Sequence, residues 1–220
     1  MAVIAVVQAR VTSSRLPGKV MMEAAGKPMI DHLMERLSYA KLDNLIIAIP
    51  DTKTNDMFAE YLYSKAYKVY RGSEDNVLRR FYEATQTLNP CQNDIIVRIT
   101  ADCPLLDPKI VNQVVTKLKL SFYDYMSNTN RYPNGIDVEA MRFWTLKEAN
   151  KNARSDYDLE HVTPYIIRNN KVGSLEGCKN LRHIRITLDT REDYILIKSI
   201  FDKLYHKDRQ FTLKQILDVL

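Results

Sequence analysis

Short apolar runs alternate with longer amphipathic stretches through the first half of the chain. The runs at residues 2–7, 45–49 and 94–100 are rich in Val, Ile and Ala, which is typical of strands covered on both faces. A shorter strand is expected at residues 68–70. Amphipathic spacing predicts helices between these strands, over residues 27–40, 55–64, 74–88 and 107–118. Alternating strands and helices favour an α/β fold, in which helices cover both faces of a mostly parallel sheet.

The regular alternation of predicted strands and helices ends at about residue 122. Further strands are expected at residues 123–128, 136–141 and 183–188. Further helices are expected at residues 143–151, 158–169, 192–205 and 212–220. Asn134-Gly135 is a turn signal, and the alternation that follows it is typical of an antiparallel or edge strand. Because no linker, repeat or low-complexity tract divides the sequence, we predict one domain over residues 1–220, with a small inserted β/α arm at about 130–180.

Charge is modest and evenly spread. The 220 residues include 32 Lys and Arg against 27 Asp and Glu, which gives a net charge of +5. The basic residues are mixed with acidic ones, and no block of like charge stands out. A basic pocket for a polyanionic small molecule explains this excess as well as nucleic acid would. We expect the small molecule and no nucleic-acid partner.

The apolar runs and the cysteines indicate in which part of the cell the protein is expected. No apolar run approaches the length needed to span a bilayer. The opening run is short, has no basic residue before it and lacks a convincing cleavage site, so we expect no signal peptide, no membrane partner and a cytoplasmic location. Cys91, Cys103 and Cys178 are odd in number and far apart, which argues against a disulfide framework or a zinc site.

Basic and hydroxyl side chains gather in the loop after the first predicted strand. This loop, residues 8–19, contains Arg10, Arg15 and Lys19 together with three hydroxyl residues, Thr12, Ser13 and Ser14. Guanidinium groups bind phosphate through paired hydrogen bonds, and Lys adds a point charge. Ligands of α/β sheets bind beyond the carboxyl ends of the strands, where this loop begins. The GxxxxGK[ST] pattern is absent, so the loop is not a P-loop. The alternatives are a triphosphate site and a solvated surface loop.

Two carboxylates follow predicted strands. Asp102 comes just after residues 94–100, and Asp189 comes just after residues 183–188. Thr190 is suited to cap the next helix with Asp193 three residues on, which leaves Asp189 free. The two strand-end carboxylates are candidates to share Mg²⁺, a hard cation held by a few carboxylates and by substrate phosphates. Each is alternatively a turn or capping residue.

A second substrate needs its own contacts. Alternation places Asp137 and Glu139 on one face of their predicted strand, and His161 follows on a predicted helix. We expect these three to bind the second substrate, although His161 is alternatively a helix-surface residue. No Ser/His/Asp or Cys/His order is compelling. Nucleotidyl transfer needs no protein nucleophile, because the acceptor oxygen attacks phosphorus while the protein positions and neutralises charge.

Several segments resemble one family. The opening QARVTSSRLPGKVMMEAAGKPMIDH is similar to the nucleotide-binding signature of the cytidylyltransferases that activate sugars, such as the CMP-3-deoxy-manno-octulosonate and CMP-acylneuraminate synthetases. The segments VYRGSEDNVLRRF, RITADCPLLDP, NGIDVE, EHVTPYI and LDTREDY extend the match in the family's order over nearly the whole chain. The chain is most similar to the spore-coat polysaccharide biosynthesis branch.

The resemblance implies a three-layer, Rossmann-like nucleotide-diphospho-sugar transferase fold. It implies a Mg²⁺-dependent reaction of CTP with an acid sugar or a related hydroxyl compound, which gives a CMP-linked product and pyrophosphate in surface polysaccharide synthesis. The residues it assigns to the nucleotide are Gln8, Ala9, Arg10, Arg15, Lys19, Arg71 and Thr100. Among these, Arg10 and Lys19 act in catalysis with Asp102, while Asp102 and Asp189 hold the metal. The resemblance also implies a homodimer, built largely by the arm.

One departure separates this chain from the sugar-acid synthetases. Those enzymes carry Gln two residues before the metal-binding Asp, where it contacts cytosine, and this chain has Thr100 there. Two alternative functions remain. A glycosyltransferase of similar fold would use a D-x-D pair, but the segment at residues 101–104 has no second Asp in register. A non-catalytic module that binds nucleotide or nucleic acid is the other.

Overall fold

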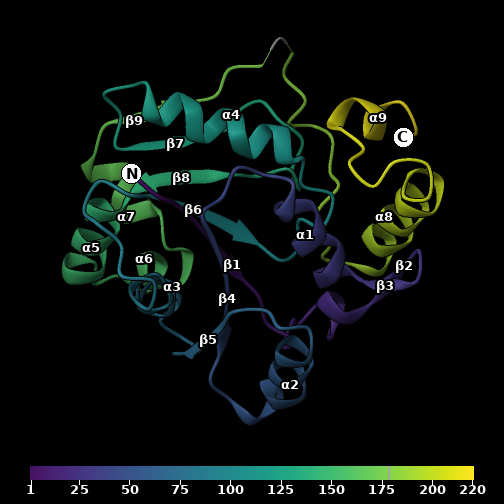
Figure 1. The fold of residues 1–220 in the computed structure, drawn as a ribbon, viewed down its shortest axis with the longest axis horizontal. Helices are drawn as coiled ribbons and strands as arrows, with labels where there is room; N and C mark the ends of the chain where they lie inside the picture. Colours follow the sequence, from purple (N-terminus) through teal and green to yellow (C-terminus); the bar gives the residue numbers. More distant parts are fainter. Residues whose placement is uncertain (178) are drawn as a thin grey trace.

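A seven-stranded sheet with helices on both faces forms the molecule (Figure 1), in a computed structural model that describes residues 1–177 and 179–220. Cys178 therefore lies outside the described residues. The strand order is β5-β4-β1-β6-β8-β7-β9. Four neighbouring strands are parallel: β5 (Val69–Gly72), β4 (Asn44–Pro50), β1 (Val3–Gln8) and β6 (Ile95–Thr100). The predicted α/β architecture, mostly parallel and Rossmann-like, is confirmed.

Beyond β6 the sheet contains one strand of the opposite direction, β8, followed by two strands that run in the same direction as β6. β8 (Glu139–Arg142) is antiparallel to β6 and to β7 (Tyr125–Ser127). β9 (Val172–Ser174) is parallel to β7 and was not predicted from the sequence. A small separate hairpin, β2 (Glu23–Ala24) with β3 (Lys27–Pro28), follows the basic loop and was also not predicted.

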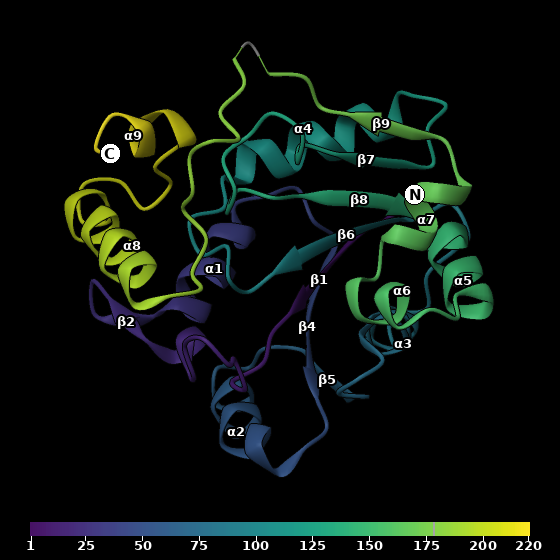
Figure 2. The same ribbon diagram turned by 180° about the vertical axis from the view of Figure 1, so that it is seen from behind.

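The two faces of the sheet carry different helices (Figures 1 and 2). One face is covered by α1 (Met29–Ser38), α2 (Asp56–Ser64), α4 (Pro108–Lys119), α8 (Arg191–Leu204) and α9 (Leu213–Leu217). The other is covered by α3 (Val77–Gln86), α5 (Phe143–Asn152), α6 (Asp156–His161) and α7 (Pro164–Asn169). β1 shows why its sequence is apolar throughout: Val3, Ala5 and Val7 face the first core, while Ile4 and Val6 face the second. No helix within the described residues is long and apolar enough to cross a membrane.

The strand predicted at residues 183–188 is wrong. This segment forms only an isolated bridge between Asn134 and Arg185, so no strand is present there. Its alternating apolar residues reflect burial, because Ile186 and Leu188 are fully covered. The segment packs tightly against Gly135, whose φ is +109° and whose missing side chain leaves room for the Ile186 backbone. The alternation of apolar residues in 183–188 thus indicated correctly which side chains are buried. The backbone of this segment forms its hydrogen bonds with loops, however, and not with a neighbouring strand.

Four predicted elements have other boundaries in the structure. The helix expected at residues 158–169 is two helices, because Pro164 lacks an N–H and Val162 has a φ of +70°. The helix expected from residue 74 begins at Val77, and the side chain of Asn76 caps it. β5 runs on through Gly72, where a turn was expected, and β8 begins only at Glu139 instead of residue 136. Asp107 caps α4, and the predicted N-cap Thr190 is confirmed in a full capping box with Asp193.

The single domain stays a prediction, and so does the arm predicted at about 130–180; the structure shows only which elements this segment contributes. It contributes β8 and β9 to the central sheet, and α5, α6 and α7 to the layer over one face. Tyr125, Met126 and Met141 are fully buried within the chain. A role of this region in dimerisation stays a prediction.

Candidate active site

A cavity of about 360 Å³ opens at the carboxyl ends of β1 and β6. β4, the next long strand in the sequence, is the neighbour of β1 on one side, and β6 is its neighbour on the other side. The cavity therefore lies at the point where the order of the strands reverses. Six of the residues predicted to bind the nucleotide line it together: Gln8, Ala9, Arg10, Arg15, Lys19 and Thr100. Both predicted metal ligands line it as well.

The basic loop is held in place by backbone contacts. The amide of Val11 donates to the buried Asn55 side chain at 3.2 Å, and the amide of Gly18 donates to the Val11 carbonyl at 2.9 Å. Gly18 adopts a φ of +69°, which favours glycine, and the short 3₁₀ helix η1 (Lys19–Met21) begins directly after it. This turn sends Lys19 inward, while Arg10 and Arg15 stay exposed.

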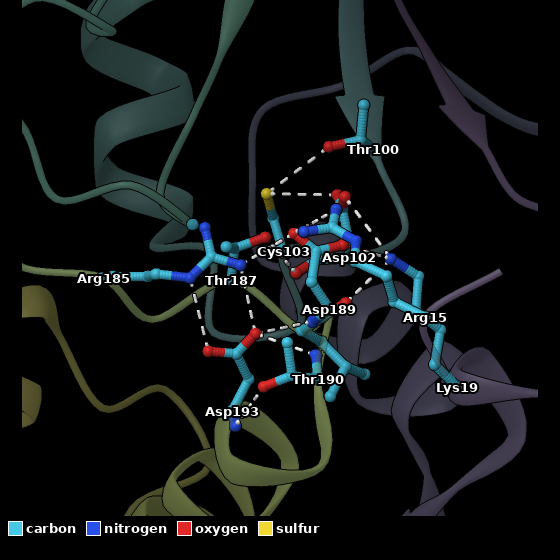
Figure 3. A network of polar contacts seen from close by, with 12 residues as sticks. Arg15, Lys19, Thr100, Asp102, Cys103, Arg185, Thr187, Asp189, Thr190 and Asp193 are labelled. Carbon is cyan, nitrogen blue, oxygen red and sulfur yellow. Dashed lines mark hydrogen bonds and ion pairs between the residues drawn. The ribbon is translucent and has the colours of Figure 1, made fainter. Parts of the chain in front are cut away.

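Lys19 lies between the two predicted metal ligands (Figure 3). Its Nζ atom is 2.8 Å from Asp189 Oδ1 and 3.6 Å from Asp102 Oδ2, and it donates to the Leu188 carbonyl at 2.7 Å. The Leu188 amide in turn donates to the Asp102 carbonyl at 2.8 Å. These contacts hold residues 183–189 against the end of β6, so the two carboxylates meet although only one of them follows a strand.

Asp189 is the most strongly paired carboxylate of the cavity. Arg15 Nη2 lies 3.2 Å from its Oδ2 atom, and Arg185 Nη2 lies 2.9 Å from the same atom. Burial alone would raise the pKa of Asp189, but hydrogen bonds from Lys19 and Arg185 outweigh burial and lower this pKa below its ordinary value. Asp189 is therefore ionised at neutral pH.

The donor chemistry fits a hard divalent cation that arrives with a polyphosphate. Asp102 and Asp189 both aim carboxylate oxygens at one point, now taken by the Lys19 ammonium. No cluster of three or more His, Cys, Asp or Glu side chains suited to a metal exists among residues 1–177 and 179–220. Mg²⁺ needs no such cage, because it binds through one or two carboxylates plus water and phosphate oxygens. Asp102 and Asp189 are thus the residues that would hold it.

Helices α3 and α6 supply a wall that the sequence analysis missed. Arg80 and Val77 come from α3, and Glu160 comes from α6 beside the predicted His161. Arg80 is only 3% exposed, and its Nη1 atom donates to the Ser73 and Glu74 carbonyls. Burial and repulsion by Arg10 lower the pKa of Arg80 to about 10, so it still carries its charge at neutral pH. No signal in the sequence distinguishes Arg80 from its exposed neighbour Arg79.

Arg98 forms part of the floor and was also missed. It lies in β6 two residues before Thr100, with its side chain 16% exposed. A charged residue inside an otherwise apolar strand was the available signal, since burying such a charge requires a partner. That partner is Glu139, which faces Arg98 across the β6–β8 pair.

Three residues predicted to bind substrate or nucleotide lie away from the cavity lining. Glu139 is buried below it and holds Arg98, Tyr125 and Thr163. Burial alone would raise the pKa of Glu139, but the charge of Arg98 and these hydrogen bonds lower it. Two other residues are ion-paired elsewhere: Asp137 with Arg182 at 2.7 Å, and Arg71 with Asp51 and Asp56 at 3.0 and 2.6 Å. Because Asp137 precedes β8, it does not share a strand face with Glu139.

Comparison with known proteins decides the family. The model of a family described as cytidylyltransferase matches residues 4–219. The chain belongs to the cytidylyltransferase family. As a member of this family, the protein is a nucleotidyltransferase enzyme, and the family resemblance noted in the sequence is confirmed.

Relatives and a solved structure cover most of this cytidylyltransferase. The spore coat polysaccharide biosynthesis protein SpsF of Bacillus subtilis is 34% identical over 90% of this chain and 85% of its own length. A 3-deoxy-manno-octulosonate cytidylyltransferase of Cellvibrio japonicus is 35% identical, but over 54% of this chain and 46% of its own. The solved structure of a cytidylyltransferase from Leptospira borgpetersenii is 29% identical, with a TM-score of 0.91 over all of this chain and 93% of that one.

Proposed function

We propose that this cytidylyltransferase transfers CMP from CTP to a hydroxyl group of an acid sugar or a related compound, with Mg²⁺ and with release of pyrophosphate. The observation that carries the proposal is the position of Lys19 between Asp102 and Asp189, in the same cavity as Arg10 and Arg15. These three cations and two carboxylates, which share one cavity, are groups that a metal–triphosphate complex requires.

The reaction needs positioning and charge neutralisation. The acceptor oxygen forms a bond to the α-phosphorus, the bond from that phosphorus to the bridging oxygen breaks, and pyrophosphate leaves with the electron pair. The proton of the acceptor hydroxyl passes to solvent. Arg10, Arg15 and Lys19 bind the triphosphate and stabilise the charge that grows on the departing pyrophosphate. Asp102 and Asp189 would hold Mg²⁺, which would supply further charge neutralisation at the phosphate oxygens.

His161 is the residue proposed to contact the acceptor. His161 lines the cavity, is exposed and lies beside Tyr157, with ring centroids 4.5 Å apart. It is the one of the three acceptor candidates that we retain for direct contact, because Asp137 is ion-paired with Arg182 and Glu139 is buried behind Arg98. The names of the B. subtilis and C. japonicus relatives support an acid sugar and a role in surface polysaccharide synthesis. A cytoplasmic homodimer is part of the proposal.

Pyrophosphate release tests the proposal directly. The purified protein is incubated with CTP, Mg²⁺ and a panel of acid sugars, and pyrophosphate is measured with an enzyme-coupled assay. A thermal-shift panel of the four nucleoside triphosphates with Mg²⁺ runs beside it, since a ligand that binds the folded state raises its apparent stability. We expect CTP to give the largest shift. A glycosyltransferase would instead consume a nucleotide sugar without releasing pyrophosphate, and a nucleic-acid-binding module would be retained on DNA in a steeply salt-dependent way.

A further inference from the structure

A chain of hydrogen bonds runs beneath the cavity and ends at its floor. Glu139 accepts from the Tyr125 hydroxyl and, at 2.7 Å, from Thr163 Oγ1, and it forms an ion pair with Arg98 Nη1. Arg98 Nε then donates to Gln8 Oε1 at 2.5 Å. Glu139 and Tyr125 are over nine-tenths buried, so the chain has one fixed arrangement.

This arrangement leaves Gln8 and Arg98 with hydrogen-bond donors to offer to a ligand. The acceptor oxygen of the Gln8 amide is taken by Arg98, so its NH₂ group is the part free to meet a ligand. Arg98 has no acceptor, and its Nη2 atom takes part in neither of the two contacts that fix the side chain. Both side chains line the cavity beside Thr100, which is the register partner of Gln8.

We propose that Gln8 and Arg98 recognise the nucleobase, with Glu139 as the positioning residue that orients them. The proposal rests on the proposed function and specifies its base selectivity. Cytosine presents two adjacent acceptors, N3 and O2, and both can receive a hydrogen bond from this floor. Uracil carries a hydrogen on N3, which would face a donor and lose a bond.

The position of the pair agrees with the rest of the cavity. The cationic loop lies at one side, where the triphosphate is proposed to bind, and the donor floor lies under the ends of β1 and β6. A nucleotide is long enough to contact both at once. Because Arg98 is neutralised by Glu139, the floor suits an uncharged base better than a phosphate.

Exchanging the Gln8 amide for a carboxylate tests the proposal. In Gln8→Glu the donor becomes an acceptor, while the ion pair with Arg98 keeps the side chain in place. We expect kcat/KM for CTP to fall about 10- to 100-fold, and we expect the CTP/UTP ratio to fall by at least that factor because the carboxylate can accept from uracil N3. Inhibition by inorganic tripolyphosphate, which lacks a base, should stay unchanged. Gln113→Glu on the exposed surface of α4 makes the same charge change as a control.

Two further variants keep the proposal testable if Gln8→Glu folds poorly. Gln8→Met removes both amide groups at similar size, and we expect the CTP/UTP ratio to fall without inverting. Thr163→Val removes one hydrogen bond to Glu139 at nearly constant shape, and we expect a smaller fall in the same ratio with normal tripolyphosphate inhibition. An unchanged CTP/UTP ratio in the Gln8 variants, with folding confirmed by thermal melting, would overturn the proposal. Wild-type protein that neither turns over CTP nor binds it more tightly than tripolyphosphate would instead overturn the proposed function.

Discussion

Lys19 Nζ and Asp189 Oδ1, only 2.8 Å apart, join segments from opposite ends of the chain into one site. The same ammonium lies 3.6 Å from Asp102. A cation between two carboxylates holds them close together, which prepares them for a divalent ion that comes with a nucleotide. The predictions below test each partner of this arrangement.

Replacing Asp102 by Asn should abolish turnover and leave the fold intact. The amide keeps the shape of the side chain but removes the charge that a metal requires, so we expect kcat to fall by at least about 100-fold. The melting temperature should change little, since the Asp102 side chain is 30% exposed and its contact with Lys19 is long. Pyrophosphate release with Mg²⁺ measures the effect, and Asp218→Asn on the exposed end of the last helix is the matched control. Mg²⁺-dependent activity near the wild-type level would refute the role of Asp102.

Replacing Lys19 by Ala should impair nucleotide use. The change removes a proposed phosphate contact and leaves Asp189 with Arg15 and Arg185 as partners. We expect kcat/KM for CTP to fall at least about 100-fold, through a higher KM, a lower kcat or both. Steady-state kinetics over a range of CTP concentrations measure this. Lys147→Ala, at an exposed position of α5, is the control, and unchanged kinetics in Lys19→Ala would contradict the assignment.

Most of the triphosphate side of the site was predictable from the sequence. The carboxyl ends of parallel strands meet at one edge of a sheet, so Gln8, Lys19 and Asp102 were expected to converge, and they do. Asp189 was placed correctly for a partly wrong reason, because residues 183–188 reach this edge by packing against loops instead of forming a strand. Burial alternation shows which side chains face inward, but it does not show what their backbone contacts.

The floor and wall of the cavity were not predictable in the same way. Arg98 and Glu139 pair because β8 lies antiparallel beside β6, and neither strand order nor register is encoded in local pattern. Arg80 differs from Arg79 only in the face of α3 that it occupies, and the helix start was misplaced by three residues, at 74 rather than Val77. Glu139, expected to touch substrate, therefore proved to be a buried partner of Arg98.

Thr100→Gln should sharpen the preference for CTP. Thr100 lines the cavity next to Gln8, and its hydroxyl makes only a 3.4 Å contact with the Cys103 sulfur, so a longer amide can extend over the floor without breaking a strong bond. We expect the CTP/UTP ratio of kcat/KM values to rise several-fold. Competition between the two nucleotides in one reaction measures it. An unaltered ratio would show that residue 100 does not contact the base.

Acid should destabilise the protein partly through Asp189. The folded-state pKa of this carboxyl lies below its ordinary value of 3.8, so its ion pairs contribute stability above that value and lose it as the pH falls through the folded-state pKa. We expect Asp189→Asn to melt at a lower temperature than wild type at neutral pH and to lose less stability on acidification. Thermal melts in a series of buffers from neutral pH down to about pH 3 would show the two curves converging. Parallel curves for variant and wild type would contradict the shifted pKa.

Gly135→Ala should disturb the site from a distance. A Cβ atom there would lie 2.4 Å from the Ile186 carbonyl carbon, and the φ of +109° is one that alanine rarely adopts. The segment that carries Asp189 must shift to relieve this contact, so we expect a loss of about 1–3 kcal/mol in the free energy of unfolding together with reduced turnover. Urea denaturation and pyrophosphate release measure the two effects. Gly177→Ala, where the nearest atom is 3.5 Å away and φ is ordinary, is the control. Full activity in a destabilised Gly135→Ala variant would show that Asp189 does not depend on this packing.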